Sequence, residues 1–251
     1  MISWLRRLVR TLGVDVVRFP PPALPPALPS DLTAAERAIV ARVAPCTMTS
    51  VERQVALIRA VEHVVQAGIP GSIVECGVWR GGSSMAAALA LMDAGDTMRD
   101  LWLYDTFEGM TAPTAADRTF DGARASDLMA RDAGASGVRA VAGLADVRAN
   151  MASTGYAADR VHFVAGPVEQ TIPMQAPEGP IALLRLDTDW HASTAHELAH
   201  LFPRLARGGV LIIDDYGHWE GARRAVDEYF ATLPTRYLLQ RIDYTGRLVI
   251  K

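Results

Sequence analysis

Four aspartates follow two apolar segments in the second half of the chain, two after each segment. Asp187 and Asp189 come at the end of the run IALLRLDTD, and Asp214 and Asp215 end the run GGVLIIDD. If both runs are neighbouring parallel strands, four carboxylates converge on one edge of a sheet, which is costly unless a cation compensates. Oxygen ligands without cysteine favour Mg²⁺, Ca²⁺ or Mn²⁺ over zinc. The pattern predicts a divalent metal site, with helix capping by Asp189 and Asp215 as the alternative.

Two further acids stand directly before turns. Glu75 precedes a glycine-rich turn (ECGVWRGG) that lacks both the G-x-G-x-x-G and the G-x-x-x-x-G-K-[ST] phosphate-binding patterns. An acid before such a turn disfavours an anion and suits a cationic group, such as the amino group of a methionine-like moiety. Asp105 ends the run DLWLYD, where a carboxylate can accept hydrogen bonds from ribose hydroxyls. Together they predict an adenosyl ligand with a cationic tail; a helix cap near Thr106 is the alternative interpretation of Asp105.

Histidines near these acids offer a weaker pattern. His196 and His200 are four residues apart, but no glutamate completes an H-E-x-x-H zinc motif. We interpret them, and His191, as ordinary helix residues. His218 and Trp219 directly follow the second acidic pair, which favours a position in the wall of a pocket.

An alternation of strands and helices from residue 72 onward must position these side chains. Strands are predicted at 72–75, 100–105, 161–165, 181–187 and 209–214, and helices at 83–92, 144–154, 193–205 and 221–233. Such alternation predicts an α/β fold with a mostly parallel sheet and helices on both faces. Ligands of such sheets bind beyond the carboxyl ends of the strands. The closing segment predicts a C-terminal antiparallel hairpin around Tyr244–Gly246.

Residues 1–70 are predicted to form an N-terminal helical extension. Residues 1–19 allow an amphipathic helix, expected to pack on a partner subunit or on the protein itself, and residues 20–29 are a proline-rich linker. Helices are expected at 34–43 and 50–66. Residues 109–143 lack a clear period, which predicts a long active-site insertion.

The composition excludes several classes of protein. The chain has 251 residues, and 25 Lys and Arg against 28 Asp and Glu give a net charge of −3, unlike a strongly basic nucleic-acid binder. No apolar run approaches the roughly 18 residues of a membrane span. Cys46 and Cys76 form neither a disulfide framework nor a zinc spacing. We therefore expect a cytoplasmic protein without a nucleic-acid partner or a membrane span.

Several stretches of the chain resemble the macrocin O-methyltransferase family, of the TylF, MycF and NovP type. These stretches are Thr47–Met48, ECGVWRGGSS, DTFEGM, the block from DVRANM to VHFVAGPVEQTIP, LDTDWHAST and LIIDDYGHWEGARRAVDEYF. The resemblance runs from about Thr47 to Phe230. It implies a class I (Rossmann-like) methyltransferase that uses S-adenosylmethionine and Mg²⁺ in a domain at 71–251. It also implies a glycosylated natural product of antibiotic biosynthesis as the acceptor, methylated on a sugar hydroxyl, and a homodimer.

By match of position, the resemblance assigns individual roles. Asp187, Asp214 and Asp215 are implied as metal ligands, and Asp189 as the general base. The implied cofactor-binding residues are Thr47, Met48, Glu75, Gly77, Val78, Trp79, Asp105, Thr106, Phe107 and Glu108. Thr47 and Met48 belong to a segment expected to close over the cofactor. The chain departs from the family pattern at Pro167–Val168, at Gln170 and in the acceptor loops at 111–143, so no acceptor is carried over.

Three other functions remain open at this point. A metal-independent small-molecule methyltransferase would differ by its insensitivity to EDTA. An NAD-dependent oxidoreductase would share the fold but should carry G-x-G-x-x-G at the first turn and needs no group of four acids. A non-catalytic adenosyl-binding scaffold would have no use for Asp189 as a fourth acid.

Overall fold

The structure is a computed structural model that describes residues 28–131 and 137–251. Residues 33–251 form one compact unit. The predicted amphipathic helix at 1–19 and most of the linker at 20–29 lie outside the described residues. The helices predicted at 34–43 and 50–66 belong to the same compact unit as the sheet.

Seven strands form one sheet in the order β3-β2-β1-β4-β5-β7-β6. The strands are β1 Ser72–Cys76, β2 Leu101–Asp105, β3 Val161–Ala165, β4 Ile181–Leu186, β5 Leu205–Ile213, β6 Gln240–Arg241 and β7 Arg247–Ile250. Strands β1 to β5 pair in parallel, and β7 is antiparallel to both β5 and β6. The predicted mostly parallel sheet with a C-terminal antiparallel hairpin is therefore confirmed.

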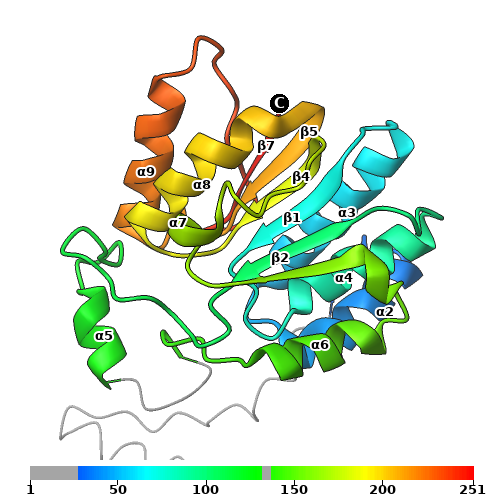
Figure 1. The fold of residues 1–251 in the computed structure, drawn as a ribbon, viewed down its shortest axis with the longest axis horizontal. Helices are drawn as coiled ribbons and strands as arrows, with labels where there is room; N and C mark the ends of the chain where they lie inside the picture. The colour runs from blue at the N-terminus through cyan, green and yellow to red at the C-terminus, as the bar shows by residue number, and fades with distance from the viewer. Residues whose placement is uncertain (1–27, 132–136) are drawn as a thin grey trace, which may run out of the picture. The chain divides into compact units, whose positions relative to one another are not determined.

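Helices gather on both sides of this sheet (Figure 1). One side carries α2 Ala34–Val43, α3 Val51–Gln66, α4 Gly82–Asp93 and α6 Leu144–Ser153; the other carries α7 Val168–Thr171, α8 His191–Leu201 and α9 Glu220–Ala231. Short 3₁₀ turns are η1 Ala44–Cys46, η2 Ala158–Arg160 and η3 Phe202–Arg204. Because both faces are covered, all six residues of β4 are buried, as expected for a central parallel strand.

The apolar spacing that predicted α3 corresponds to its buried side. Val55, Ile58, Val61 and Val64 are all buried, and Ser50 caps the helix by accepting a hydrogen bond from the Arg53 amide (3.2 Å). On the opposite side of the sheet, α8 and α9 contribute buried apolar residues to the main core. This packing holds the carboxyl ends of the strands in fixed positions.

The insertion at 109–143 is more ordered than the sequence predicts, because it contains a helix, α5 Ala125–Arg131. Seven residues make about two turns, too few for an apolar period to be recognised. The first part of the insertion is attached to the domain: Trp190 Nε1 donates to the Thr111 carbonyl (3.1 Å), and Asp117 accepts a hydrogen bond from the His191 amide (2.9 Å). Asp117 thereby caps α8, whose own N-cap residue supplies no side-chain bond.

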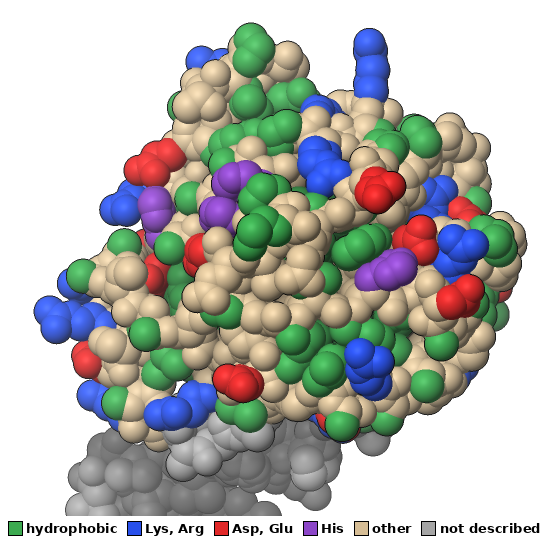
Figure 2. All heavy atoms as spheres, viewed as in Figure 1, with side chains coloured by type: hydrophobic (Ala, Val, Ile, Leu, Met, Phe, Trp, Pro, Cys, Tyr) green, Lys and Arg blue, Asp and Glu red, His purple; other side chains and the backbone are tan. Residues whose placement is uncertain are grey.

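The surface seen in Figure 2 is mixed in character, with Lys and Arg side chains standing among Asp, Glu and apolar ones. On this face the basic groups of the described residues do not collect into one patch. None of the described helices combines the length and the apolar character that crossing a membrane requires.

Candidate active site

A cavity of about 340 Å³ opens at the carboxyl ends of the parallel strands. Its walls include eight of the ten predicted cofactor-binding residues and all four aspartates after β4 and β5. Phe107 and Glu108 are not part of the walls: Phe107 is buried near Phe163 (ring centroids 6.4 Å apart), and Glu108 is exposed. The cavity therefore joins the two groups of residues that the sequence singled out, and direct cofactor contacts by Phe107 and Glu108 stay a prediction.

The turn between β1 and α4 presents bare backbone to this cavity. Gly77 has a φ of +82°, and a Cβ there would collide with the Asp187 carbonyl of the neighbouring β4 end. A Cβ at Gly82 would collide with the Cys46 carbonyl, so the Thr47–Met48 segment lies directly against the start of α4. Within the described residues, the buried Trp79 Nε1 has no hydrogen-bond partner. Glycine is therefore required at positions 77 and 82 for the turn to pack against the end of β4 and against the Cys46–Thr47 segment.

Asp105 connects the β1 turn with the end of β2. Its Oδ2 accepts hydrogen bonds from the Val78 and Trp79 amides (2.7 and 3.1 Å), and its Oδ1 accepts one from the Phe107 amide (2.7 Å). No helix follows β2 before α5, so the interpretation of Asp105 as a helix cap is wrong. Oδ1 also lies 3.4 Å from the Thr106 hydroxyl, which makes a shorter bond (2.6 Å) to the Gly109 carbonyl, so Oδ1 can accept one further bond from a ligand. A ribose contact by Asp105 stays a prediction.

Glu75 is more deeply placed than its proposed role suggests. It is 4% exposed, accepts a hydrogen bond from Ser84 Oγ, and forms an ion pair with Arg185 (2.8 Å). Burial raises the pKa of Glu75, and the Arg185 guanidinium acts against this shift. Glu75 still contributes to the cavity wall. Any cationic ligand group would share this carboxylate with the arginine.

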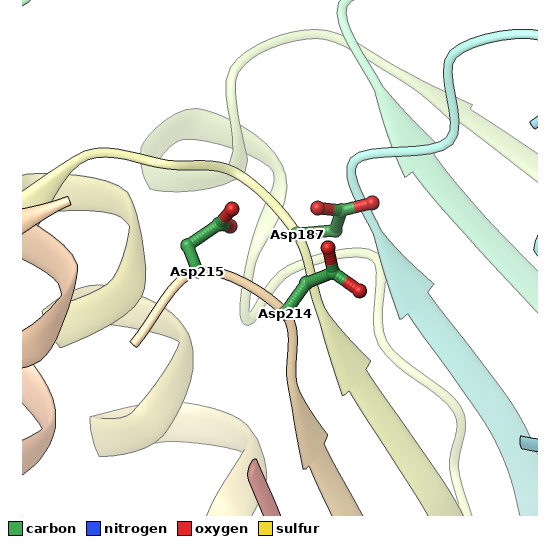
Figure 3. Close-up of side chains that lie close together, drawn as sticks. All are labelled: Asp187, Asp214 and Asp215. Carbon is green, nitrogen blue, oxygen red and sulfur yellow. The ribbon is translucent and has the colours of Figure 1, made fainter. Parts of the chain in front are cut away.

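Three of the four aspartates form a close group at the ends of β4 and β5. One oxygen from each of Asp187, Asp214 and Asp215 lies within 4.8 Å of the others (Figure 3). The register of the two strands explains this, because Leu186 pairs with Ile213, so that the residues directly after both strands stand side by side. All the donor atoms are carboxylate oxygens, which fits a hard divalent cation such as Mg²⁺.

Two arginines in this group were missed by the sequence analysis. Arg185 on β4 is 3% exposed, and its guanidinium bonds Glu75 (2.8 Å), Asp187 (2.7 Å) and Asp214 (2.6 Å). Arg53 on α3 forms an ion pair with the other oxygen of Asp214. A lone arginine inside the apolar run IALLRLD, two residues before Asp187, is the signal that could have revealed Arg185.

These arginines do not neutralise the whole group. Five carboxylates (Glu75, Asp187, Asp189, Asp214 and Asp215) face two guanidinium groups (Arg53 and Arg185). Burial raises the pKa of Asp187 and of Asp215 well above the ordinary range, and neighbouring carboxylates add to both shifts. The remaining excess of negative charge would be relieved by a divalent cation, so the residues present fit one.

Asp189 belongs to the same wall but not to the group of three. It has a left-handed backbone (φ +66°), and its amide donates to Asp215 Oδ2 (3.2 Å). Burial raises the pKa of Asp189 to about 7, and the Asp187 and Asp214 carboxylates add to the shift. The N-caps of α8 and α9 are Trp190 and Trp219, neither with a side-chain cap bond, so the capping interpretation of Asp189 and Asp215 is wrong.

Comparison with known proteins decides the family. The family model described as macrocin-O-methyltransferase (TylF) matches residues 32–250. The chain belongs to this family. The membership confirms the predicted family and the predicted enzyme class, an S-adenosylmethionine-dependent O-methyltransferase, and contradicts the oxidoreductase and scaffold alternatives.

Individual relatives agree with the assignment. The chain is 41% identical, over 80% of its length and 73% of the relative, to 8-demethyl-8-(2,3-dimethoxy-alpha-L-rhamnosyl)-tetracenomycin-C 4'-O-methyltransferase of Streptomyces olivaceus. It is 36% identical to mycinamicin III 3''-O-methyltransferase of Micromonospora griseorubida, over 73% of this chain and 69% of that protein.

Solved structures confirm the fold class. The O-methyltransferase NovP superposes with a TM-score of 0.72 and 31% identity, covering 82% of each chain. An O-methyltransferase from Bacillus cereus in complex with SAH shares the fold at a TM-score of 0.52 and 15% identity, over 100% of both chains.

Proposed function

We propose that this macrocin-type methyltransferase transfers the methyl group of S-adenosylmethionine to a sugar hydroxyl of a glycosylated natural product, in a Mg²⁺-dependent reaction. The observation that carries the proposal is the single cavity that joins the β1 turn to the aspartates after β4 and β5. The names of two relatives also support a sugar acceptor: one acts at position 4' of a rhamnosyl tetracenomycin and one at position 3'' of mycinamicin III.

The end of the cavity formed by β1 and β2 would bind the methyl donor. Glu75 would face its amino group and Asp105 its ribose hydroxyls, since both residues are part of this wall. Thr47 and Met48 line the same end, and Thr47 lies against the start of α4. In this arrangement they would cover the bound donor and exclude water.

The end formed by β4 and β5 would bind the metal and activate the acceptor. Asp187, Asp214 and Asp215 would hold Mg²⁺, which supplies Lewis-acid chemistry that lowers the pKa of a hydroxyl. Arg185 would orient Asp187 and Asp214, since its guanidinium bonds both.

Asp189 would then accept the proton of the acceptor hydroxyl at its carboxylate. Asp189 lies in the cavity wall and its amide bonds Asp215, which puts a proton acceptor directly beside the proposed metal ligands, as a general base requires. Methyl transfer is a direct displacement, so the chain must also hold donor and acceptor in line.

Methyl transfer from labelled S-adenosylmethionine tests the proposal. The acceptors are the rhamnosyl tetracenomycin of the first relative, mycinamicin III and demethyldecarbamoylnovobiocin, the last taken from a relative in Streptomyces niveus that is 34% identical. We expect labelled product from at least one acceptor with Mg²⁺ and none after EDTA, with recovery when Mg²⁺ is added back. Full activity in EDTA would favour the metal-independent methyltransferase. The homodimer and the cytoplasmic location are also proposals, for which light scattering and cell fractionation are the measurements.

A further inference from the structure

Aromatic rings gather at the mouth of the cavity, next to the aspartates. His218 and Tyr244 are part of the wall, with ring centroids 6.1 Å apart and a contact of 3.3 Å between Tyr244 OH and His218 Nδ1. Phe120 lies edge-on to His218 (6.2 Å between centroids). Tyr244 is 54% exposed and Phe120 is 65% exposed. Large exposed apolar side chains that cluster beside a cavity are typical of a ligand-binding surface.

Backbone hydrogen bonds also hold the three segments that carry these rings together. The Phe120 amide donates to the His218 carbonyl (2.9 Å), which attaches the insertion to the segment after β5. The Gly217 amide donates to the Thr245 carbonyl (2.9 Å), and a Cβ at Gly217 would collide with the Tyr244 carbonyl. The rings therefore form one preformed surface made of three chain segments.

This aromatic surface is built directly on the predicted metal ligands. The His218 amide donates to the Asp215 carbonyl (3.0 Å), and Thr245 Oγ1 donates to the Asp214 carbonyl (2.7 Å). A molecule lying on His218 and Tyr244 would thus have its edge beside the carboxylates. Among the residues that the structure describes, none bonds Nε2 of His218, so this atom is available to a hydroxyl of such a molecule.

We propose that His218, Tyr244 and Phe120 determine acceptor specificity: the sugar ring lies on Tyr244 and bonds His218, and the aglycone packs on Phe120. The proposal rests on the proposed function, because it needs a glycosylated acceptor. The apolar face of a pyranose suits an aromatic ring, and its hydroxyls suit the imidazole. Phe120 lies outside the cavity wall and is the most exposed of the three, which assigns it to the part of the acceptor farther from the aspartates.

Kinetics with the best acceptor of the panel, and with the methyl glycoside of its sugar, test this assignment. We expect Tyr244→Ala to raise KM for both acceptors about 3- to 10-fold, the range for one lost aromatic contact. Phe120→Ala should raise KM for the full acceptor alone, since the methyl glycoside has no aglycone. The Kd of S-adenosylmethionine, measured by calorimetry, should be unchanged in both variants. Met174→Ala, at an exposed apolar residue outside the cavity wall, is the matched control.

A binding measurement separates this proposal from the proposed function. Saturation-transfer NMR uses phenyl α-L-rhamnopyranoside with the wild-type protein, Mg²⁺ and S-adenosylhomocysteine, and then with Tyr244→Ala. Rhamnoside binding that is lost in the variant supports the subsite even if no acceptor is methylated. The absence of binding to the wild type, an unchanged KM in Tyr244→Ala, or an equal effect of Met174→Ala would overturn the proposal.

Discussion

The two ends of the cavity satisfy their carboxylates in different ways. At the end formed by β1 and β2, which would bind the methyl donor (the donor end), the Asp105 carboxylate accepts hydrogen bonds from three backbone amides. These amides are uncharged and fixed by the fold. At the end formed by β4 and β5 (the acid end), Asp214 forms ion pairs with two side-chain cations, Arg53 and Arg185. An excess of negative charge remains around it. The difference indicates that the donor end is complete as folded, whereas the acid end needs a cation or protons.

Asp215→Asn is expected to give the largest effect on kcat. Within the described residues no arginine forms an ion pair with Asp215, so a metal ion would be its main cationic partner. Its loss should remove a metal ligand and lower kcat by about 10³-fold, which corresponds to several kcal/mol of lost Lewis-acid stabilisation. The measurement is the initial rate at saturating Mg²⁺, together with the Kd of S-adenosylmethionine by calorimetry without metal. The donor affinity should not change.

Asp159→Asn, at an exposed position outside the cavity, is the control for Asp215→Asn. Retention of the full rate in Asp215→Asn, or an equal loss in both variants, would remove Asp215 from the metal site. The proposed contrast between the two ends would then lack its main support.

Asp189→Asn tests whether Asp189 acts as the base while the other three aspartates of the acid end bind the metal. The amide keeps the shape of the side chain but cannot accept a proton, so kcat should fall by about 10²-fold. Calorimetric titrations should give unchanged affinities for Mg²⁺ and S-adenosylmethionine, because Asp189 lies outside the group of three. Weakened metal binding with activity restored at high Mg²⁺ would make Asp189 a ligand instead of the base.

Asp105→Ala tests the donor end alone. Loss of hydrogen bonds to ribose should weaken S-adenosylmethionine binding about tenfold, or 1.4 kcal/mol, with or without Mg²⁺. Calorimetry in EDTA is the measurement. The matched variant is Asp159→Ala, at an exposed residue outside the cavity wall, which should bind the donor as the wild type does. Equal affinity in all three proteins would exclude Asp105 from the cofactor site.

Asp117→Ala should give the smallest effect, on stability. Asp117→Ala removes the bond that Asp117 accepts from the His191 amide and the two that it accepts from the amide and hydroxyl of Thr114, so the loss should be at least the roughly 1 kcal/mol of a helix cap. For a domain of this size, a lower Tm by about 2–4 °C in a thermal melt corresponds to that loss. Asp117→Asn keeps an acceptor oxygen and should lose less. If both variants melt with the wild type, the insertion is not attached to α8 through this residue.

Much of the fold could be predicted because apolar periodicity and strand alternation are local properties of the sequence. The order of the strands is not local, and it explains what was missed. β1 lies next to β4, so Glu75 pairs with Arg185 although the two are 110 residues apart. An arginine inside an apolar strand can be read from the sequence, but its partners follow only from the topology.

The residues of the candidate site likewise fall into those that the sequence predicts and those that only the topology reveals. The four aspartates at strand ends could be located because a parallel sheet brings its carboxyl ends to one edge. The contacts of Arg53, Asp117 and Tyr244 depend on how α3, the insertion and the β6–β7 turn fold over that edge. Such contacts join segments far apart in the chain, and no spacing rule predicts them.

The cap that Asp117 places on α8 affects how this enzyme could be recombined with its relatives. Exchanging the insertion at 109–143 for that of a relative is an obvious way to change which acceptor is methylated. The first turn of α8, however, starts at His191, two residues after Asp189, and is capped by a carboxylate from inside that segment. A replacement loop without an equivalent acceptor atom would leave the first turn of α8 uncapped and could displace Asp189, the proposed base. Chimaeras should therefore cross over after Asp117 or carry this aspartate with them.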